Sequence, residues 1–297
     1  MSYINKAFEL IKPDKDCIYE KCINRSTLDQ LQIVANNLGY NNNNTNEEDV
    51  LEFLTKKLDC KYKTYGCVLY KIKDDPKLNK FIDMDILLEQ LKKIKVEGPH
   101  DSIEWFSNYN IDNTLEQVSD IVNNKSDDKF LHIYFHMIDY KTANKLSSKY
   151  KNINMINFAD EYNRGIRRIG VVFNTDTYSG NGQHWFAVYC DLRTNPMTLE
   201  YFNSTGEEMY TEISELLSDI SNQIRFSLKK KGEENVKIEK IKVTDIEHQT
   251  DNHSCGSYSL YYIISRLLEV PYSFFSNTPI PSDLMIKFRE HLFVHNE

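Results

Sequence analysis

One cysteine of the chain stands in a setting suited to nucleophilic catalysis. Cys255 lies in the segment Asn252-His253-Ser254-Cys255-Gly256-Ser257, immediately before an apolar stripe at helical spacing. A thiol at the start of a helix meets the positive end of the helix dipole and unpaired N–H groups, and both favour the reactive thiolate. Gly256 leaves room for the backbone of a substrate. Cys255 is therefore the predicted nucleophile, and the other five cysteines lack this setting.

A catalytic thiol needs a general base and donors for the oxyanion. His184 follows the Gly-containing turn 179–182 and precedes a run of strand-forming residues, so its ring is predicted at the rim of a sheet. Asn203, 19 residues later, ends the next predicted strand and can fix the tautomer of the imidazole. Gln249 stands six residues before Cys255 and can donate to a developing oxyanion. Taken together in this order, the four residues predict cysteine-dependent acyl transfer.

Other residues compete for these roles. His253 is a rival base, although its place two residues from Cys255 on one loop makes the geometry awkward. Asp191 is the second choice for orienting His184, but it lies about seven residues, or ~23 Å, along the same predicted strand. The pair His132-x3-His136 resembles two metal ligands. Its surroundings are strand-like and no third ligand is suitably spaced, so neither a metal nor another cofactor is expected.

The four residues fall in a stretch that mixes strands and helices. Strands are predicted at 130–138, 169–173, 185–190, 198–203 and 236–243, and helices at 114–122, 212–228 and from 256 onward. Residues 1–98 are predicted to be mostly helical, with a capping box at Thr45-x-x-Glu48 and a helix at 83–94. Gly98-Pro99 then breaks the chain. We therefore predict a helical arm of residues 1–98 and an α/β or α+β core of residues 99–297.

Composition limits the class of protein. The 297 residues carry 36 Lys and Arg against 44 Asp and Glu, a formal charge of −8, which argues against unaided binding to nucleic acid. The run Lys229-Lys230-Lys231 fits a solvated helix end better than a nucleic-acid patch. No apolar run reaches about 18 residues and the start lacks a signal-peptide core, so no membrane partner is expected and the protein is expected inside the cell. The six cysteines contain no CxxC pair, and free thiols are expected in a reducing compartment.

Several segments carry a resemblance to a known family. They are Asn174-Thr175-Asp176, Gly182-Gln183-His184-Trp185, residues 200–206 and residues 248–260, and the ending 287–293 is also similar. Their order and spacing resemble the adenain-like and SUMO-protease superfamily of cysteine proteases, above all its polyprotein-processing members from large DNA viruses. The resemblance covers about residues 98–297 and extends faintly into the arm.

The resemblance implies an α+β fold with a papain-like or adenain-like core, in which helices flank a central mixed sheet. It implies that Cys255 is the nucleophile, that His184 is the general base and that Asn203 orients His184. Gln249 and the backbone N–H of Cys255 would line the oxyanion hole. Trp185 matches the family tryptophan that covers a narrow channel for a Gly-rich substrate backbone.

The same resemblance implies a function in a large DNA virus. The protein would cleave structural polyprotein or capsid precursors after small Gly-Gly-X type sites during virion maturation, in the host cytoplasm (the virus factory) and in the virion. An alternative with the same chemistry is removal of SUMO or ubiquitin from host proteins, and another is an inactive module that binds a peptide in the old cleft. Intact Cys255, His184 and Gln249 argue against the inactive module.

The chain departs from the cellular enzymes at two places, and the first of them, Asn203, favours the viral branch. Many ubiquitin-like proteases have Asp where this chain has Asn203. Their early Trp-Leu-x-Asp motif corresponds here to residues 109–115, which lack the tryptophan. A two-tryptophan tunnel for a ubiquitin-like tail is therefore not expected.

Overall fold

The structure is a computed structural model that describes residues 3–10, 23–41, 46–60, 65–91, 96–99, 103–124, 126–142 and 152–294. Its residues group into two compact units. One contains Met1–Leu10 and Asp101–Arg289, and the other contains Ile11–His100 and Glu290–Glu297. The first ten residues thus group with the larger unit and the last eight with the smaller one. The division into an arm of residues 1–98 and a core of residues 99–297 stays a prediction. No described helix is long and apolar enough to cross a membrane.

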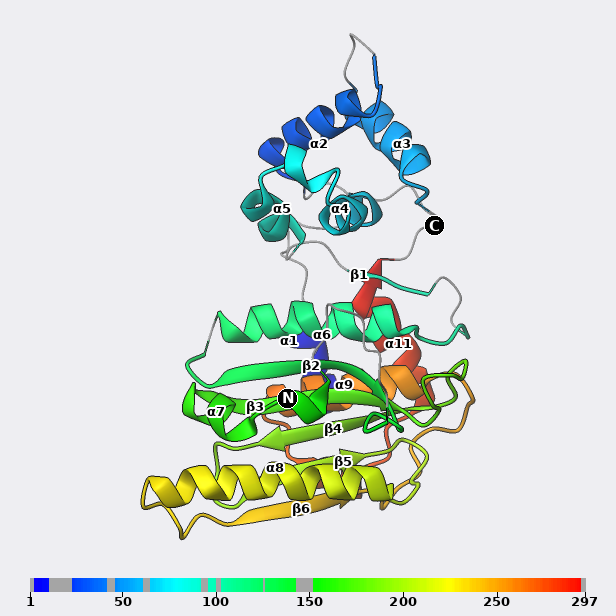
Figure 1. Cartoon of the computed structure of the whole chain (residues 1–297). Helices are drawn as coiled ribbons and strands as arrows, with labels where there is room; N and C mark the ends of the chain where they lie inside the picture. Colours follow the sequence, from blue (N-terminus) through cyan, green and yellow to red (C-terminus); the bar gives the residue numbers. More distant parts are fainter. Residues whose placement is uncertain are drawn as a thin grey trace. The chain divides into compact units, whose positions relative to one another are not determined.

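The larger unit is built on a five-stranded mixed sheet, which confirms the predicted fold class (Figure 1). Its strands are β2 (Lys129–Met137), β3 (Ile166–Asn174), β4 (Trp185–Asp191), β5 (Met197–Phe202) and β6 (Ile238–Val243), and they lie side by side in this order. The two outer pairs are parallel, whereas β4 is antiparallel to both of its neighbours. All five strands overlap the ranges expected from the sequence.

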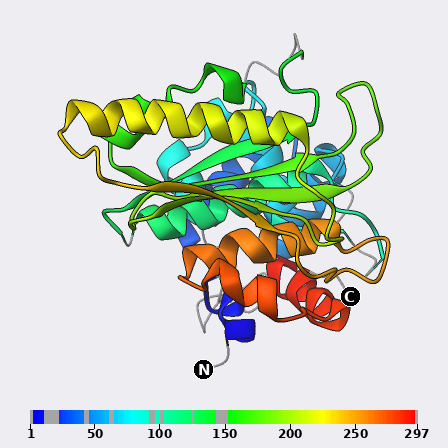
Figure 2. The ribbon, with the colours of Figure 1, turned by 90° about the horizontal axis from the view of Figure 1, so that it is seen from below.

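Helices cover both faces of this sheet. α8 (Thr211–Lys230) lies on one face and α9 (Cys255–Leu267) on the other, so the unit has three layers (Figure 2). Every residue of β4 and β5 is buried, because a central strand covered on both faces has no solvent side. The remaining helices of this unit are η1 (Tyr3–Asn5), α1 (Ala7–Leu10), α6 (Asn108–Asn123), η3 (Ile153–Met155), α7 (Phe158–Asn163), α10 (Tyr272–Asn277) and α11 (Ser282–Leu292), the last of which ends in the smaller unit.

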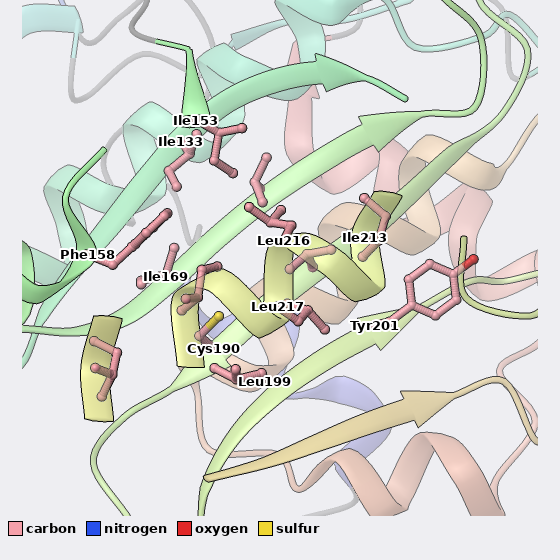
Figure 3. Close-up of a cluster of buried hydrophobic side chains, with 14 of the residues drawn as sticks. Ile133, Ile153, Phe158, Ile169, Cys190, Leu199, Tyr201, Ile213, Leu216 and Leu217 are labelled. Atoms are coloured by element: carbon pink, nitrogen blue, oxygen red, sulfur yellow. The ribbon is translucent and has the colours of Figure 1, made fainter. Parts of the chain in front are cut away.

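The layer between α8 and the sheet is an apolar core. Ile213, Leu216 and Leu217 of α8 belong to one buried cluster with Cys190 and Leu199 of the strands (Figure 3). All five side chains are at most 3% exposed. Each large aliphatic side chain buried in this way stabilises the fold by about 1.5–3 kcal/mol. This packing fixes the central strands whose ends carry the candidate site.

The smaller unit is a cluster of helices. They are α2 (Arg25–Asn37), α3 (Glu47–Lys57), α4 (Tyr65–Asp74), η2 (Asn79–Phe81) and α5 (Met84–Leu91), and two short strands, β1 (Val96–Glu97) and β7 (Phe293–Val294), pair in parallel. The residue directly after β1 is Gly98. A larger residue does not fit there, because a Cβ would lie 2.2 Å from the Phe293 ring. The predicted capping box is wrong: the N-cap of α3 is Asn46, whose side chain accepts from the Glu48 N–H. Thr45 lies outside the described residues.

The expectation of free thiols is wrong for one pair of cysteines. Cys60 and Cys67 form a disulfide, with their Cα atoms 5.9 Å apart. The fold brings them together because Cys60 lies just beyond α3 and Cys67 lies in the first turn of α4, a separation that a disulfide can span. Cys190 and Cys255 are free and buried. Cys17 and Cys22 lie outside the described residues.

Candidate active site

His184 and Asn203 meet at one end of the central antiparallel strand pair. His184 directly precedes β4 and Asn203 directly follows β5. With Ala187 opposite Phe202, the start of β4 lies beside the end of β5. His184 Nε2 lies 2.8 Å from Asn203 Oδ1. The fold therefore brings together the predicted base and the residue predicted to orient it.

The carboxamide of Asn203 has a fixed orientation, and this sets the tautomer of His184. Asn203 Oδ1 accepts from the backbone N–H and the hydroxyl of Thr205 at 3.2 and 2.9 Å. Asn203 Nδ2 donates to the Tyr201 hydroxyl at 3.1 Å. Since a backbone N–H can only donate, the Asn203 atom that faces the imidazole is its oxygen. His184 Nε2 must then carry a hydrogen, which leaves Nδ1 as the basic nitrogen of the neutral ring.

Cys255 is the first residue of α9, and only 3% of its surface is exposed. The backbone N–H groups of Trp185, Gly256 and Cys255 itself lie close enough to the thiol to favour its ionised form. Trp185 directly follows His184 in the chain, so the influence of its N–H on the thiol indicates that the sulfur lies near the end of β4 that carries the candidate base. Three separate elements, β4, β5 and α9, thus converge on one thiol.

Burial dominates the protonation of this thiol. Burial raises the pKa of Cys255 above its ordinary value and the nearby Asp251 carboxylate adds to the rise, while the three backbone N–H groups oppose it. The expectation that the helix start would favour the thiolate is therefore wrong for the net shift, because the loss of solvation outweighs the N–H groups. A neighbouring imidazole that accepts the proton is then the more effective route to a thiolate.

Gln249 is held on several sides in the loop before α9. Its backbone N–H donates to Ser204 O at 2.9 Å, and its Oε1 accepts from the Ser204 hydroxyl at 2.8 Å. Its Nε2 donates to Asp251 O at 2.8 Å, which fixes the nitrogen end of the carboxamide because a carbonyl only accepts. The Asp251 carboxylate accepts from the backbone N–H groups of His253 and Ser254 and so folds the loop onto the start of α9. Burial opposes ionisation of Asp251, but these bonds lower its pKa overall.

The two tryptophans of the chain, Trp105 and Trp185, line one pocket. The pocket has a volume of about 430 Å³, and its walls include Trp105, Phe106, Tyr178 and Trp185. The indole N–H of Trp185 donates to Phe106 O at 2.9 Å, which holds the ring in place. Residues 109–115 lack a tryptophan, but Trp105 supplies a second one to this pocket, and the expectation about a tunnel for a ubiquitin-like tail stays a prediction. Trp105 stands four residues before the stretch 109–115 assigned to the family motif, and the aromatic pair Trp105-Phe106 just before a helix was the sequence sign of it.

Gly256 makes room for a side chain of the protein itself. A Cβ at Gly256 would lie 2.8 Å from the ring of Phe106, which is only 3% exposed. The missing side chain lets Phe106 pack against the first turn of α9. Phe106 therefore contacts both parts of the site: its ring packs against the helix of Cys255, and its carbonyl oxygen accepts from the indole N–H of Trp185. Contact of Gly256 with a substrate stays a prediction.

The other candidates from the sequence have different surroundings. His253 Nδ1 lies 3.6 Å from Asp251 Oδ1. Asp191 lies at the far end of β4 and accepts from the Arg193 guanidinium at 2.7 and 2.9 Å. Both ring nitrogens of His136 bond backbone groups, so this residue serves the fold. Within the described part of the chain, no group of three or more His, Cys, Asp or Glu side chains is arranged to hold a metal ion.

Comparison with known proteins gives consistent results. The family model of the Ulp1 protease family, C-terminal catalytic domain, matches residues 104–297. The "SUMO-1 cysteine protease S273R" of a Kenyan isolate of African swine fever virus is 28% identical over 260 residues, spanning 83% of this chain and 88% of that protein. The "Cysteine protease S273R" of an isolate from Malawi is 29% identical over 263 residues with the same coverage. The crystal structure of the pS273R protease of African swine fever virus matches with a TM-score of 0.63 and 25% identity, over 96% of this chain and 95% of that one.

Proposed function

The chain belongs to the Ulp1 protease family and is a cysteine peptidase, and we propose that it is an endopeptidase that cleaves viral polyprotein or capsid precursors after small Gly-Gly-X type sites. The observation that carries this proposal is the His184–Asn203 pair beside a Cys255 sulfur that is almost fully buried. A scissile carbonyl reaches so enclosed a sulfur most easily when the residues on its acyl side lack bulky side chains. This favours glycine before the cleaved bond.

In the proposed reaction, His184 Nδ1 takes the proton of the Cys255 thiol, and the thiolate attacks the carbonyl carbon. The oxyanion accepts from a Gln249 Nε2–H and from the backbone N–H of Cys255. His184 then passes its proton to the leaving amine as the C–N bond breaks. Water, deprotonated by His184, attacks the thioester and restores the thiol. Asn203 holds Nε2–H throughout and so keeps Nδ1 available.

Removal of a ubiquitin-like modifier is the second candidate, and one observation favours it. Trp105 and Trp185 line the same pocket, and flat aromatic walls suit an extended tail without side chains. One relative is itself named a SUMO-1 cysteine protease. The two candidates share every catalytic step and differ only in the protein that carries the glycine segment. For the polyprotein-processing role, we expect the protein in the virus factory of the host cytoplasm and in the virion.

A cleavage assay separates these candidates. Purified wild-type protein and Cys255→Ala are offered Gly-Gly-X peptides beside SUMO and ubiquitin conjugates. Cysteine-dependent cutting of the peptides without the conjugates supports the polyprotein-processing role. Cutting of the conjugates alone supports removal of ubiquitin-like modifiers instead. A modifier with an electrophile at its C-terminus should label Cys255 rapidly only in the second case.

A further inference from the structure

Two consecutive residues after β5 each hold a different part of the candidate site. Asn203 bonds His184, and Ser204 bonds Gln249. Both residues are almost completely buried, at 0% and 1% exposure. A hydroxyl buried in this way needs a hydrogen-bond partner inside the protein, and the Gln249 carboxamide supplies it.

Ser204 fixes Gln249 through both backbone and side chain. Its carbonyl oxygen accepts from the N–H groups of His248 and Gln249 at 2.8 and 2.9 Å, and its hydroxyl donates to Gln249 Oε1 at 2.8 Å. One Nε2–H of Gln249 donates to Asp251 O. The carboxamide is thus held at its oxygen and at one of its two N–H bonds. Its second N–H meets no acceptor among the described residues.

We propose that Ser204 is a positioning residue for the oxyanion hole. Its hydroxyl holds the Gln249 carboxamide in the rotamer that presents the second Nε2–H to the developing oxyanion. This inference rests on the proposed role of Gln249 in acyl transfer. Without the Ser204 bond, the carboxamide can turn about its last side-chain torsion and present that N–H for only part of the time. An interaction that strengthens in the transition state affects the rate of acylation rather than substrate binding.

The test uses two reactions of the same sulfur. Acylation by the p-nitrophenyl ester of an N-acylated Gly-Gly dipeptide passes through an oxyanion, whereas alkylation by iodoacetamide does not. We expect Ser204→Ala to slow first-turnover p-nitrophenol release at saturating ester about tenfold, which corresponds to about 1.4 kcal/mol. The half-saturating ester concentration and the rate of iodoacetamide alkylation should stay within twofold of wild type.

A matched control removes the same kind of bond elsewhere. Ser227 is also buried, and its hydroxyl donates to Asn163 Oδ1 at 2.7 Å between α8 and α7. Ser227→Ala should lose similar thermal stability and keep wild-type acylation. A double variant supplies the second control: when Gln249 is already Ala, Ser204→Ala should slow acylation no further, because the group that it positions is gone.

The outcomes are distinct. Wild-type acylation in folded Ser204→Ala, an equal loss of alkylation and acylation, or a full further loss in the Gln249→Ala background would each overturn the role of Ser204. Failure of the wild-type protein to cut Gly-Gly-X peptides would overturn the proposed substrate but not this inference, since the activated ester needs no recognition of a protein substrate.

Discussion

Replacing Asn203 by Ala tests whether this residue orients the base. The substitution removes the oxygen that faces His184 Nε2, together with the acceptor of the Thr205 N–H and hydroxyl. The freed imidazole can rotate, and its two tautomers become more nearly equal in energy. The fraction of molecules with a basic Nδ1 directed at the sulfur then falls, and so does the stabilisation of the imidazolium that forms during attack.

The structure sets the size of this effect. The bond is short, at 2.8 Å, and its acceptor is fully buried, so water replaces it poorly. Hydrogen bonds to charged groups contribute about 1.5–3 kcal/mol. At about 1.4 kcal/mol per factor of ten, the loss of the bond to the imidazolium lowers the acylation rate about 10- to 140-fold. The unpaired Thr205 N–H lowers the free energy of unfolding by a further ~1–3 kcal/mol without acting on the rate.

First-turnover acylation and iodoacetamide alkylation of Cys255 measure this prediction. Asn203→Ala should slow both reactions, in contrast to Ser204→Ala, because both need the thiolate. Asn203→Asp is the matched control: one oxygen still faces His184, and the other faces the Tyr201 hydroxyl, which can donate to it. We expect this variant to stay within tenfold of wild type. Wild-type acylation and alkylation rates in a folded Asn203→Ala protein would refute the reasoning.

Three further predictions concern the nucleophile and the stability of the larger unit. Cys255→Ala should abolish peptide cleavage and leave the thermal melting temperature nearly unchanged; persistent cleavage would remove Cys255 from the mechanism. Burial lowers the pKa of His248 to about 4, so the unfolded chain binds a proton at higher pH than the folded one. Urea denaturation should therefore show that the free energy of unfolding falls by about 3 kcal/mol as the pH drops from about 6.5 to 4. His248→Gln should flatten this dependence, and an unchanged slope would contradict the prediction. Glu200→Gln removes the bidentate carboxylate of the buried Arg266 guanidinium and leaves only Asp191, at 3.7 Å, as a charged partner, so it should cost about 3 kcal/mol. Lys242→Ala breaks an exposed pair and should cost under about 1 kcal/mol in the same thermal melts.

The sequence predicts the site well where chemistry lies at the ends of regular elements. The strand after His184 is an apolar run from Trp185 to Cys190, the strand before Asn203 is a short run bounded by turn residues, and the helix of Cys255 shows a stripe at helical spacing, so their ends can be predicted from the pattern. Because β4 and β5 are neighbours in sequence, an antiparallel pair brings these ends together with few alternatives. The roles themselves came from motif order, which periodicity alone does not provide.

Other features depend on packing that one sequence does not reveal. The rise in the pKa of Cys255 is a balance between burial and backbone N–H groups, and only coordinates give its sign. The pocket position of Trp105 was missed because the search for a second tryptophan was confined to residues 109–115, whereas Trp105 lies before the helix that contains them. The Cys60–Cys67 disulfide depends on how two helix ends approach, which the spacing of seven residues leaves open. Ser204 lies in a segment that carries the family resemblance, but its hydrogen bond to Gln249 is visible only in the structure.

Contacts between strand β5 and helix α9 fix the position of the helix along the strand, and with it the position of Cys255 relative to Asn203. Near the site, Asn203 directly follows β5 and Cys255 begins α9. Farther along, the Glu200 carboxylate accepts from the Arg266 guanidinium. Between them, Phe202 stacks on Tyr262 with ring centroids 4.3 Å apart and planes 6° apart. A slip of α9 by one turn, about 5.4 Å, would break both contacts at once.

Stacked rings and a bidentate ion pair constrain the helix differently. The stack depends on shape and tolerates loss of charge, whereas the ion pair depends on burial of both partners. If the stack alone holds the register, Glu200→Gln should lower stability while the folded fraction alkylates Cys255 at the wild-type rate. A loss of alkylation larger than the unfolded fraction explains would mean that the ion pair, 11 residues along α9 from the thiol, also sets the position of the nucleophile.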